Sequence, residues 1–520
     1  MSFFLGAGRQ FDKQKLSRRK AIGLLGLGIL ATQFPFACTT GTSKLSEVEK
    51  QSLHYLTLME VAELIKSKRI SSEELTQIML NRIAALDSRL NSYITVMSEF
   101  ALASARALDN ELAKGKYRGP LHGVPIGVKD LLYTTNAPTT GSHSFNANFM
   151  ATYNATVVDK LQRAGAVILG KLNLTEGAMG GYNTSSRIPK NPWGEDLWTG
   201  VSSSGSGVAT AAGLCFASIG SDTGGSIRFP SVANGIVGLK PTYGLVSKYG
   251  VMPLSQSLDH IGPMTRSTLD AAVMLEAIAG YDANDPNSLN ENNITISSSI
   301  KDGIKGLRIG IDHDYVNNGV DPNLIASIDQ AVKKLEELGA IIRPFKMPDN
   351  RKERDDAWWI ICCKEAYEAN KNIYPSRKTE YGNCFAEFLE IGSKVAKDQY
   401  EQALQFREEF KGQFRILLSE VDALVAPAGG MTKGVNDTMW RAKMVENVIG
   451  IYGDALDLHF GNPADIAGIP ALTLPCGKAE NGLPPPGFQL MGSPLTESTL
   501  CRIGYAYERV TEWHKQHPDI

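Results

Sequence analysis

The chain has 520 residues, of which 43% are hydrophobic and 21% charged, and its formal net charge is −2. This balance is ordinary for a globular protein and gives no reason to expect nucleic acid or an acidic membrane surface as a partner. Domains usually contain about 100–200 residues. Because no Pro/Ser-rich linker divides the chain, we nevertheless expect one large domain.

The first 38 residues have the pattern of a leader. Arg18, Arg19 and Lys20 precede an apolar run over 21–37 that is too short and too interrupted to span a membrane. A basic flank, an apolar core and small residues predict a signal peptide over 1–38, and the paired arginines favour twin-arginine export. Cys38 is a candidate lipid acceptor. We therefore expect an exported, periplasmic or extracytoplasmic protein, either free or tethered through Cys38.

After a linker over 39–55, helix and strand signals alternate through a domain at 56–520. Thr57-x-x-Glu60 and Ser71-x-x-Glu74 are capping-box patterns that open two helices. The predicted helices are 58–68, 72–90, 99–114, 267–279, 323–338 and 397–418. The predicted strands are 124–128, 166–169, 216–221, 307–311, 424–426 and 471–475. Short, continuously apolar strands that alternate with helices predict an α/β fold with a largely parallel, buried sheet.

The cysteines and histidines show no metal-binding pattern. Seven cysteines occur without a Cys-x-x-Cys spacing, and eight histidines occur without His-Glu-x-x-His. We therefore expect no metal, no cofactor and mostly buried free thiols. The P-loop pattern is absent as well, and no Gly-x-Gly-x-x-Gly lies at a strand–helix junction, which argues against a phosphate-binding loop.

The most informative stretch runs over 200–230 and ends in a glycine turn, Asp222-Thr223-Gly224-Gly225-Ser226. Glycines let successive backbone N–H groups converge on one point, and such a nest stabilises the oxyanion that forms when a carbonyl is attacked. The serine at the end of the turn is a candidate nucleophile. The stretch contains no histidine to activate it, and the chain has no Gly-x-Ser-x-Gly elbow.

A candidate base lies upstream, where an apolar strand over 123–128 delivers Lys129 to its carboxyl end. Apolar walls lower the pKa of a lysine and make the neutral amine available. A single serine in a Gly/Ser-rich segment, such as Ser202, is most often a turn residue. A single lysine at the end of a strand, such as Lys129, is most often exposed to solvent. The joint occurrence of the segments is what argues for chemistry. Asp222 and Arg228 are expected to form an ion pair that rigidifies the turn.

These segments resemble the amidase signature family. Its lysine follows a Gly-Val-Pro strand, one serine lies in a Gly/Ser-rich segment, and its nucleophile ends an Asp-Thr-Gly-Gly-Ser turn. The resemblance implies a Ser–cis-Ser–Lys triad of Ser226, Ser202 and Lys129, with the two serines 24 residues apart. It also implies a mixed, mostly parallel many-stranded central sheet sandwiched between helices, and an oxyanion hole formed by the N–H groups of Thr223, Gly224, Gly225 and Ser226.

The resemblance is close over 56–290, moderate near the end, and weak over a variable substrate region at about 291–461. Val201 and Ser204 depart from the family, which often has glycine there. The family places substrate contacts at the positions of Met179, Gly180 and Tyr182, for which core packing is an equal interpretation. Core packing is the favoured interpretation for Trp358, Trp359 and Trp440.

The implied function is hydrolysis of a small linear carboxylic amide to an acid plus an amine or ammonia. It proceeds without a cofactor through a Ser226 acyl-enzyme, with Lys129 as base through the bridging Ser202. The alternatives are an ester hydrolase, a glutamine-dependent amidotransferase subunit, and a catalytically silent binding homologue. We expect no nucleic-acid partner and no transmembrane span in the mature chain. The sequence leaves the substrate open, and also whether the protein is a monomer or a homodimer.

Overall fold

The computed structural model describes residues 44–291, 294–430, 434–435, 437–441 and 458–520. Residues Lys44–Ile520 form one compact unit. The predicted signal peptide and Cys38 lie outside the described residues. The predicted linker over 39–55 is described only from residue 44, and there it contains α1 (Glu47–Gln51) and the 3₁₀ turn Leu53–Tyr55. Leu45 and Leu53 are buried, so this part packs on the domain.

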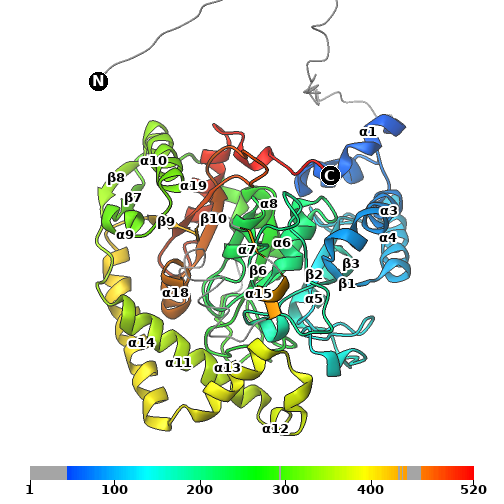
Figure 1. Ribbon diagram of the computed structural model, residues 1–520. Coiled ribbons are helices and arrows are strands. Elements are labelled where there is room, and N and C mark those ends of the chain that lie inside the picture. Colours follow the sequence, from blue (N-terminus) through cyan, green and yellow to red (C-terminus); the bar gives the residue numbers. More distant parts are fainter. Residues whose placement is uncertain (1–43, 292–293, 431–433, 436, 442–457) are drawn as a thin grey trace, which may run out of the picture. The chain divides into compact units, whose positions relative to one another are not determined.

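A mixed sheet forms the centre of the unit and is flanked by helices (Figure 1). Its 11 strands have the order β1-β3-β2-β4-β6-β5-β10-β11-β9-β7-β8. Their bounds are β1 Tyr93–Val96, β2 Pro125–Lys129, β3 Val167–Leu172, β4 Ala217–Asp222, β5 Val237–Lys240, β6 His260–Thr265, β7 Arg308–Ile311, β8 Ile341–Pro344, β9 Ala423–Pro427, β10 Ala471–Pro475 and β11 Gly487–Met491. The predicted α/β fold with a mixed, many-stranded sheet is confirmed.

Parallel pairs are not the majority in this sheet, which corrects one part of the prediction. Four neighbouring pairs are parallel and six are antiparallel. A parallel pair needs a long crossover, whereas antiparallel neighbours can follow each other through short loops. The loop between β10 and β11 contains Asn481 and Gly482 with φ of 54° and 75°, which suits a tight turn.

The helices lie in groups along the sheet. In Figure 1, α3 and α4 lie beside β1 and β3, and α11, α13 and α14 lie together at the lower end. The bounds are α2 Leu58–Lys66, α3 Ser72–Leu90, α4 Ser98–Ala113, α5 Thr156–Ala164, α6 Ser204–Ala211, α7 Arg228–Ala233, α8 Thr268–Ile278, α9 His313–Asn317, α10 Pro322–Glu337, α11 Arg351–Asn370, α12 Tyr374–Arg377, α13 Asn383–Lys394, α14 Lys397–Leu418, α15 Asp437–Arg441, α18 Leu458–Ala467 and α19 Glu497–Glu508.

Local capping explains why the predicted helices begin where they do. Thr57 accepts from the Glu60 N–H, and the Glu60 carboxylate accepts from the Thr57 N–H, so the first capping box is complete. Ser71 accepts from the Glu74 N–H at 3.0 Å and opens α3. Helices α3 and α14 match their predicted bounds residue for residue.

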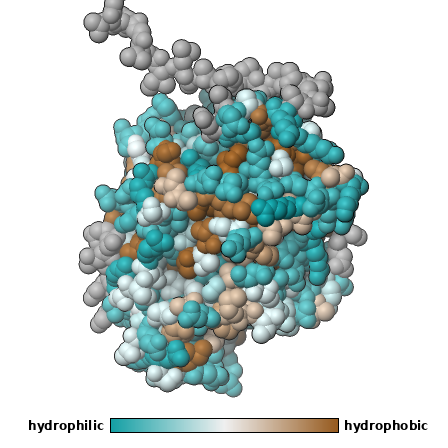
Figure 2. Space-filling view, turned by 90° about the vertical axis from the view of Figure 1, so that its right-hand side faces the viewer, coloured by the Kyte–Doolittle hydropathy of each residue, from teal (hydrophilic) through white to brown (hydrophobic). Residues whose placement is uncertain are grey.

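The surface and the cysteines agree with a domain that has one main core. Figure 2, which views the side of α3 and α4, shows hydrophilic side chains with smaller apolar patches between them. The six described cysteines are buried and none of them forms a disulfide, as predicted. Among the described residues, no helix is long and apolar enough to cross a membrane. The C-terminal segment returns to the start of the domain, where Tyr55 stacks on His517 and donates to the Pro518 carbonyl (Figure 1).

A buried ion pair joins the ends of β2 and β3. Lys171 Nζ lies 2.9 Å from Asp130 Oδ1, and neither side chain is exposed to solvent. Burial raises the pKa of Asp130 and lowers the pKa of Lys171, so each charge depends on the other. The second Asp130 oxygen accepts from the Thr140 N–H at 2.9 Å, which ties the following loop to the strand.

Lys171→Met is expected to destabilise the fold by about 3–5 kcal/mol, because it leaves the Asp130 carboxylate buried without its counter-ion. Urea unfolding measures the change. The double variant Lys171→Met/Asp130→Leu should recover most of the loss, since no buried charge then remains. A double variant no more stable than Lys171→Met would contradict the expected role of the pair.

Candidate active site

Two neighbouring parallel strands deliver the main polar groups of the candidate site to the same edge of the sheet. Strand β2 ends at Lys129 and strand β4 ends at Asp222. Val128 pairs with Ile219, so the strands are in register near these ends. The glycine turn with Ser226 follows β4 directly. The expectation that the lysine and the turn meet at the carboxyl ends of strands therefore holds in the structure.

Lys129 is fully buried and contacts three serine hydroxyls. Its Nζ lies 2.7 Å from Ser202 Oγ, 2.9 Å from Ser203 Oγ and 2.8 Å from Ser221 Oγ. All three serines are buried. Ser203 Oγ also donates to the Ser221 carbonyl at 3.1 Å, which fixes the serine cluster against β4. The predicted pairing of Lys129 with Ser202 is present as a direct contact.

The amine has an unusual protonation equilibrium. Burial lowers the pKa of Lys129 from its ordinary 10.5 to about 7, while the more distant carboxylates of Asp222 and Asp259 act in the opposite direction. Desolvation dominates because removing an ammonium ion from water is costly, and hydroxyls compensate only part of that cost. Near neutral pH a large fraction of Lys129 is therefore an uncharged amine able to accept a proton.

Ser202 and Ser226 lie on adjacent backbone segments. The peptide bond between Val201 and Ser202 is cis. The Ser203 N–H donates to the Ser226 carbonyl at 3.3 Å, and the Thr175 N–H donates to the Ser202 carbonyl at 3.3 Å. Within the described residues no hydrogen bond joins the two hydroxyls of Ser202 and Ser226. Ser226 is partly exposed, whereas Lys129 and Ser202 are buried, so Ser226 is the member of this group that solvent reaches.

The predicted oxyanion donors are not equivalent. The Gly225 N–H donates to Asp222 Oδ1 at 2.6 Å and is therefore occupied. The N–H groups of Thr223, Gly224 and Ser226 have no acceptor within the part of the chain that the structure describes. Gly225 has φ of 118°, a backbone conformation that residues with a side chain rarely adopt, which explains the glycine at this position. Three of the four predicted donors are therefore free to bind an oxygen.

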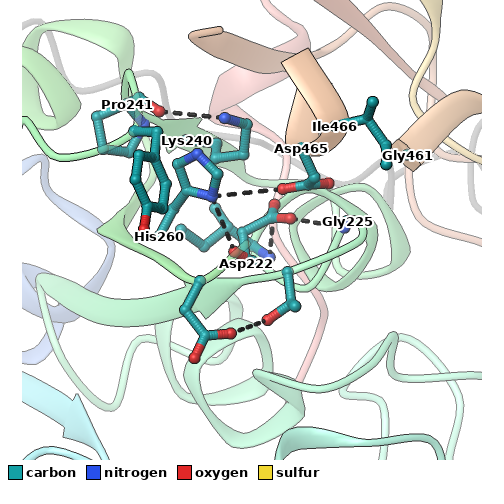
Figure 3. A network of polar contacts seen from close by, with 12 residues as sticks. Asp222, Gly225, Lys240, Pro241, His260, Gly461, Asp465 and Ile466 are labelled. Atoms are coloured by element: carbon teal, nitrogen blue, oxygen red, sulfur yellow. Dashed lines mark hydrogen bonds and ion pairs between the residues drawn. The ribbon is translucent and has the colours of Figure 1, made fainter. Parts of the chain in front are cut away.

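The glycine turn contacts a buried network of charged groups around Asp222 (Figure 3). Arg228 Nε lies 3.0 Å from Asp222 Oδ2, and Arg228 Nη2 lies 2.6 Å from Asp465 Oδ2. Arg228 also donates to the Gly461 carbonyl and to Gln489 Oε1. The predicted ion pair is confirmed, and it belongs to a larger network that reaches the C-terminal part of the chain.

The network shifts the pKa values of its two aspartates in opposite directions. The Asp222 pKa lies below its ordinary value because the charge and hydrogen bonds of Arg228 outweigh burial. Burial and the nearby Asp222 charge raise the pKa of Asp465 well above its ordinary value. Burial lowers the pKa of His260 far below its ordinary range, so its ring is neutral. Because His260 Nδ1 lies 3.2 Å from the Asp222 carbonyl oxygen, we assign the ring proton to Nδ1 (Figure 3).

Two later segments cover the turn. Trp358 Nε1, on α11, donates to the Thr223 carbonyl at 2.8 Å. A side chain on Gly461 would place its Cβ 2.3 Å from the Gly224 carbonyl oxygen, so the backbone of α18 approaches the turn as closely as a glycine permits. Trp358 is buried, in agreement with the core interpretation, and it also fixes the turn.

The predicted substrate residues Met179, Gly180 and Tyr182 follow β3, and at least the tyrosine is a packing residue. Tyr182 is 2% exposed, and its hydroxyl lies 2.5 Å from Ser204 Oγ. It belongs to a small apolar cluster that also contains Ile188, Trp198, Val201, Phe229, Ala233 and Trp440. Val201 and Ser204, which depart from the family pattern, thus contact Tyr182 or its cluster. Met179 is partly exposed and Gly180 is buried.

Sequence reasoning missed several residues that the structure brings into the site. Ser203 and Ser221 contact Lys129, Asp259 accepts from the Thr223 hydroxyl at 2.6 Å, and Asp465 binds Arg228. Ser203 directly follows the predicted Ser202, and Ser221 precedes the glycine turn, so their positions in the two motifs were the available signal. Asp259 and Asp465 gave no such signal, because their partners are distant in sequence.

Comparisons with known proteins place the chain in a family. The Amidase family model matches residues 74–501. The chain is 40% identical to "Putative amidase AmiD" of Mycobacterium tuberculosis over 483 residues, which cover 91% of this chain and 98% of the relative. It is 37% identical to an amidotransferase subunit for glutamyl-tRNA(Gln) from Moorella thermoacetica, over 90% of this chain and 99% of the relative.

Among solved structures, the native peptide amidase from Stenotrophomonas maltophilia superposes with a TM-score of 0.76 at 31% identity, covering 88% of this chain and 97% of that chain. The fold and the match to the family model define an enzyme of the class that hydrolyses carbon–nitrogen bonds. The chain belongs to the amidase signature family.

Lys129→Met is expected to change the pH dependence of stability. The lysine titrates near about 10.4 in an unfolded chain and near 7 in the fold. Between these values the unfolded chain binds more protons, so the wild type gains stability as the pH rises through this window. Below pH 7 both states are protonated, and the fold bears the full cost of a buried charge.

We therefore expect the Tm of Lys129→Met to exceed that of wild type most at pH 6, and the difference to shrink towards pH 10. Thermal unfolding from pH 6 to pH 10 measures it. Lys171→Met serves as the control, because that lysine pairs with a carboxylate. A Tm difference between wild type and Lys129→Met that does not vary with pH would rule out the lowered pKa.

Proposed function

We propose that this chain is a serine amidase that hydrolyses a linear carboxylic amide to a carboxylic acid and an amine or ammonia. Ser226 is the nucleophile, Ser202 relays the proton and Lys129 is the base. The observation that carries the proposal is the 2.7 Å contact between the buried Lys129 amine and Ser202 Oγ, beside a partly exposed Ser226. The carbon–nitrogen hydrolases in its family support the same chemistry.

The first half-reaction forms an acyl-enzyme. Ser226 Oγ attacks the amide carbonyl carbon while its proton passes to Ser202 Oγ, and the Ser202 proton passes to the neutral Lys129 amine. The carbonyl oxygen becomes an oxyanion, for which the N–H groups of Thr223, Gly224 and Ser226 are the available donors. The carbon–nitrogen bond then breaks, and the reversed relay delivers a proton to the departing nitrogen.

The second half-reaction uses water in place of the amine. Water attacks the Ser226 ester while its proton passes to Ser202 Oγ and the Ser202 proton passes to Lys129. The bond between the acyl carbon and Ser226 Oγ then breaks, and the reversed relay returns a proton to Ser226 Oγ as the carboxylic acid leaves. The lysine is protonated for part of each half-reaction, and this ammonium form is stabilised because its three N–H groups face the hydroxyl oxygens of Ser202, Ser203 and Ser221. The same pocket therefore favours a neutral amine at rest and holds the ammonium ion that forms in the reaction.

Ser226→Ala is expected to abolish hydrolysis of an amide panel, Lys129→Ala nearly to abolish it, and Ser202→Ala to lower kcat by about 10³-fold or more. Ser203→Ala is the matched control, since it removes a hydroxyl that contacts Lys129 but leaves Ser202 and Ser226 in place. Its loss of kcat should be much smaller. A fluorophosphonate probe should label Ser226 alone. Wild-type turnover by Lys129→Ala would exclude the lysine as base.

The alternative functions give different outcomes in the same assays. An ester hydrolase would turn over esters and leave every amide intact, and a silent binding homologue would not react with the fluorophosphonate. Relatives at 37% identity are named as amidotransferase subunits. A chain with that role would hydrolyse glutamine and depend on partner subunits, whereas the amidase proposed here acts as an isolated chain.

We further propose that the protein is exported through its N-terminal leader, on the basis of Arg18, Arg19 and the apolar run over 21–37. Replacing both arginines by lysine is expected to leave the full-length protein in the cytoplasm, because the twin-arginine route depends on the arginine pair. Cell fractionation with immunoblotting measures this. Unchanged export of the lysine variant would contradict the twin-arginine assignment, and a Cys38→Ala variant that leaves the membrane fraction would identify a lipid tether.

A further inference from the structure

Arg354 is a buried arginine whose guanidinium lacks most of its partners. It lies in the second turn of α11, and its side chain has no exposure to solvent. Its Nη2 lies 2.7 Å from His459 Nδ1. Its Nε and Nη1 have no hydrogen-bond partner within the described residues. Arg228 shows the contrast, because Nε, Nη1 and Nη2 of that buried guanidinium all have acceptors.

The neighbours of Arg354 leave two of its guanidinium nitrogens without an acceptor within the described residues. Burial, followed by the charges of Arg354 and Arg351, lowers the pKa of His459 to about 3, so the imidazole is neutral and its Nδ1 accepts from Arg354 Nη2. Asp355 Oδ1 lies 3.6 Å from Arg354 Nη2, so the two side chains form an ion pair without a hydrogen bond, and the same oxygen accepts from Asn462 Nδ2 at 3.2 Å. This ion pair leaves Nε and Nη1 unused, and buried donors without an acceptor are costly.

Two separate contacts place Arg354 near the glycine turn. Residues four apart on a helix are neighbours at about 6 Å, and Trp358, four residues after Arg354, donates to the Thr223 carbonyl. On the other side, Gly461 follows His459 by two residues and lies against the Gly224 carbonyl. Both α11 and α18 begin beside Arg354, and helix N-termini carry partial positive charge.

We propose that Arg354 binds a carboxylate carried by the amide substrate, at some distance from the scissile carbonyl. The substrate class is then that of amides with a remote carboxylate, such as monoamides of dicarboxylic acids. This inference rests on the proposed amidase function of the Ser226 site. Arg354 acts as a specificity residue, because it contacts the remote end of the substrate and takes no part in the proton relay.

The test compares two series of amides of increasing chain length. One series is the dicarboxylic monoamides from succinamate to suberamate, and the other is the straight-chain alkyl amides of matched length, which end in a methyl group. Hydrogen bonds to charged groups change binding by about tenfold or more. Wild type should therefore favour the charged series in kcat/KM by about that factor at its best length. Arg354→Met should lose this preference and keep its activity on the neutral series.

Thermal unfolding separates a binding role from a structural one. Arg354→Met should unfold at the same temperature as wild type or higher, since it removes two buried donors that have no acceptor within the described residues. The matched control is Arg266→Met, at a buried arginine whose Nη1 donates to the Thr210 and Cys215 carbonyls. That variant should unfold at a lower temperature and keep the preference for charged amides. A loss of Tm in Arg354→Met together with equal losses on both series would overturn the proposal.

A binding measurement keeps the inference distinct from the proposed function. Adipate, a dicarboxylate with no amide to hydrolyse, should raise the Tm of wild type and of Ser226→Ala but not that of Arg354→Met. If wild type hydrolyses neither series, the amidase proposal fails, and the adipate shift still decides whether Arg354 binds a carboxylate. If wild type hydrolyses both series equally, or adipate shifts all three proteins alike, the assignment of Arg354 is wrong and the amidase proposal stands.

Discussion

The exclusion of water from one lysine amine is the constraint on which the site depends. An ammonium ion in contact with solvent would keep its ordinary pKa and be unable to accept a proton at neutral pH. In this fold Lys129 ends a strand in the interior of a wide sheet, with β3 and β4 on either side. The environment that removes water also removes hydrogen-bond partners, and Ser202, Ser203 and Ser221 replace them. The serine-rich segment is thus needed to provide hydrogen-bond partners for Lys129 as much as to take part in the reaction of the substrate.

The second requirement is a rigid turn, which is met by contacts distant in sequence. Asp222 accepts from the Gly225 and Ile227 N–H groups and so holds the backbone on either side of Ser226. Arg228 in turn connects Asp222 to Asp465, more than 200 residues later. The region between, in which the sequence motifs resemble those of the family only weakly, supplies Trp358. The geometry of a short motif therefore depends on α11, α18 and β11 as much as on its own residues.

The sequence predicted those features that are local. Caps and apolar periodicity located α3 and α14, and the motifs located Lys129, Ser202 and the turn. Strands β5, β6 and β11 were missed because they contain Gly, Pro, His or Thr and are paired through antiparallel contacts with distant strands. The unpartnered nitrogens of Arg354 were likewise beyond prediction, since they arise from tertiary packing.

The unequal exposure of the three candidate catalytic groups also decides which of them a chemical reagent can modify. Ser226 is partly open, while Lys129 lies behind it with no exposed surface. Acylating agents that modify amines should therefore react with the many surface lysines and spare Lys129, although its low pKa leaves more of it uncharged at neutral pH than an ordinary lysine. Small electrophiles that enter past Ser226 face an alcohol first, so selective inactivators of this enzyme are best designed around serine chemistry.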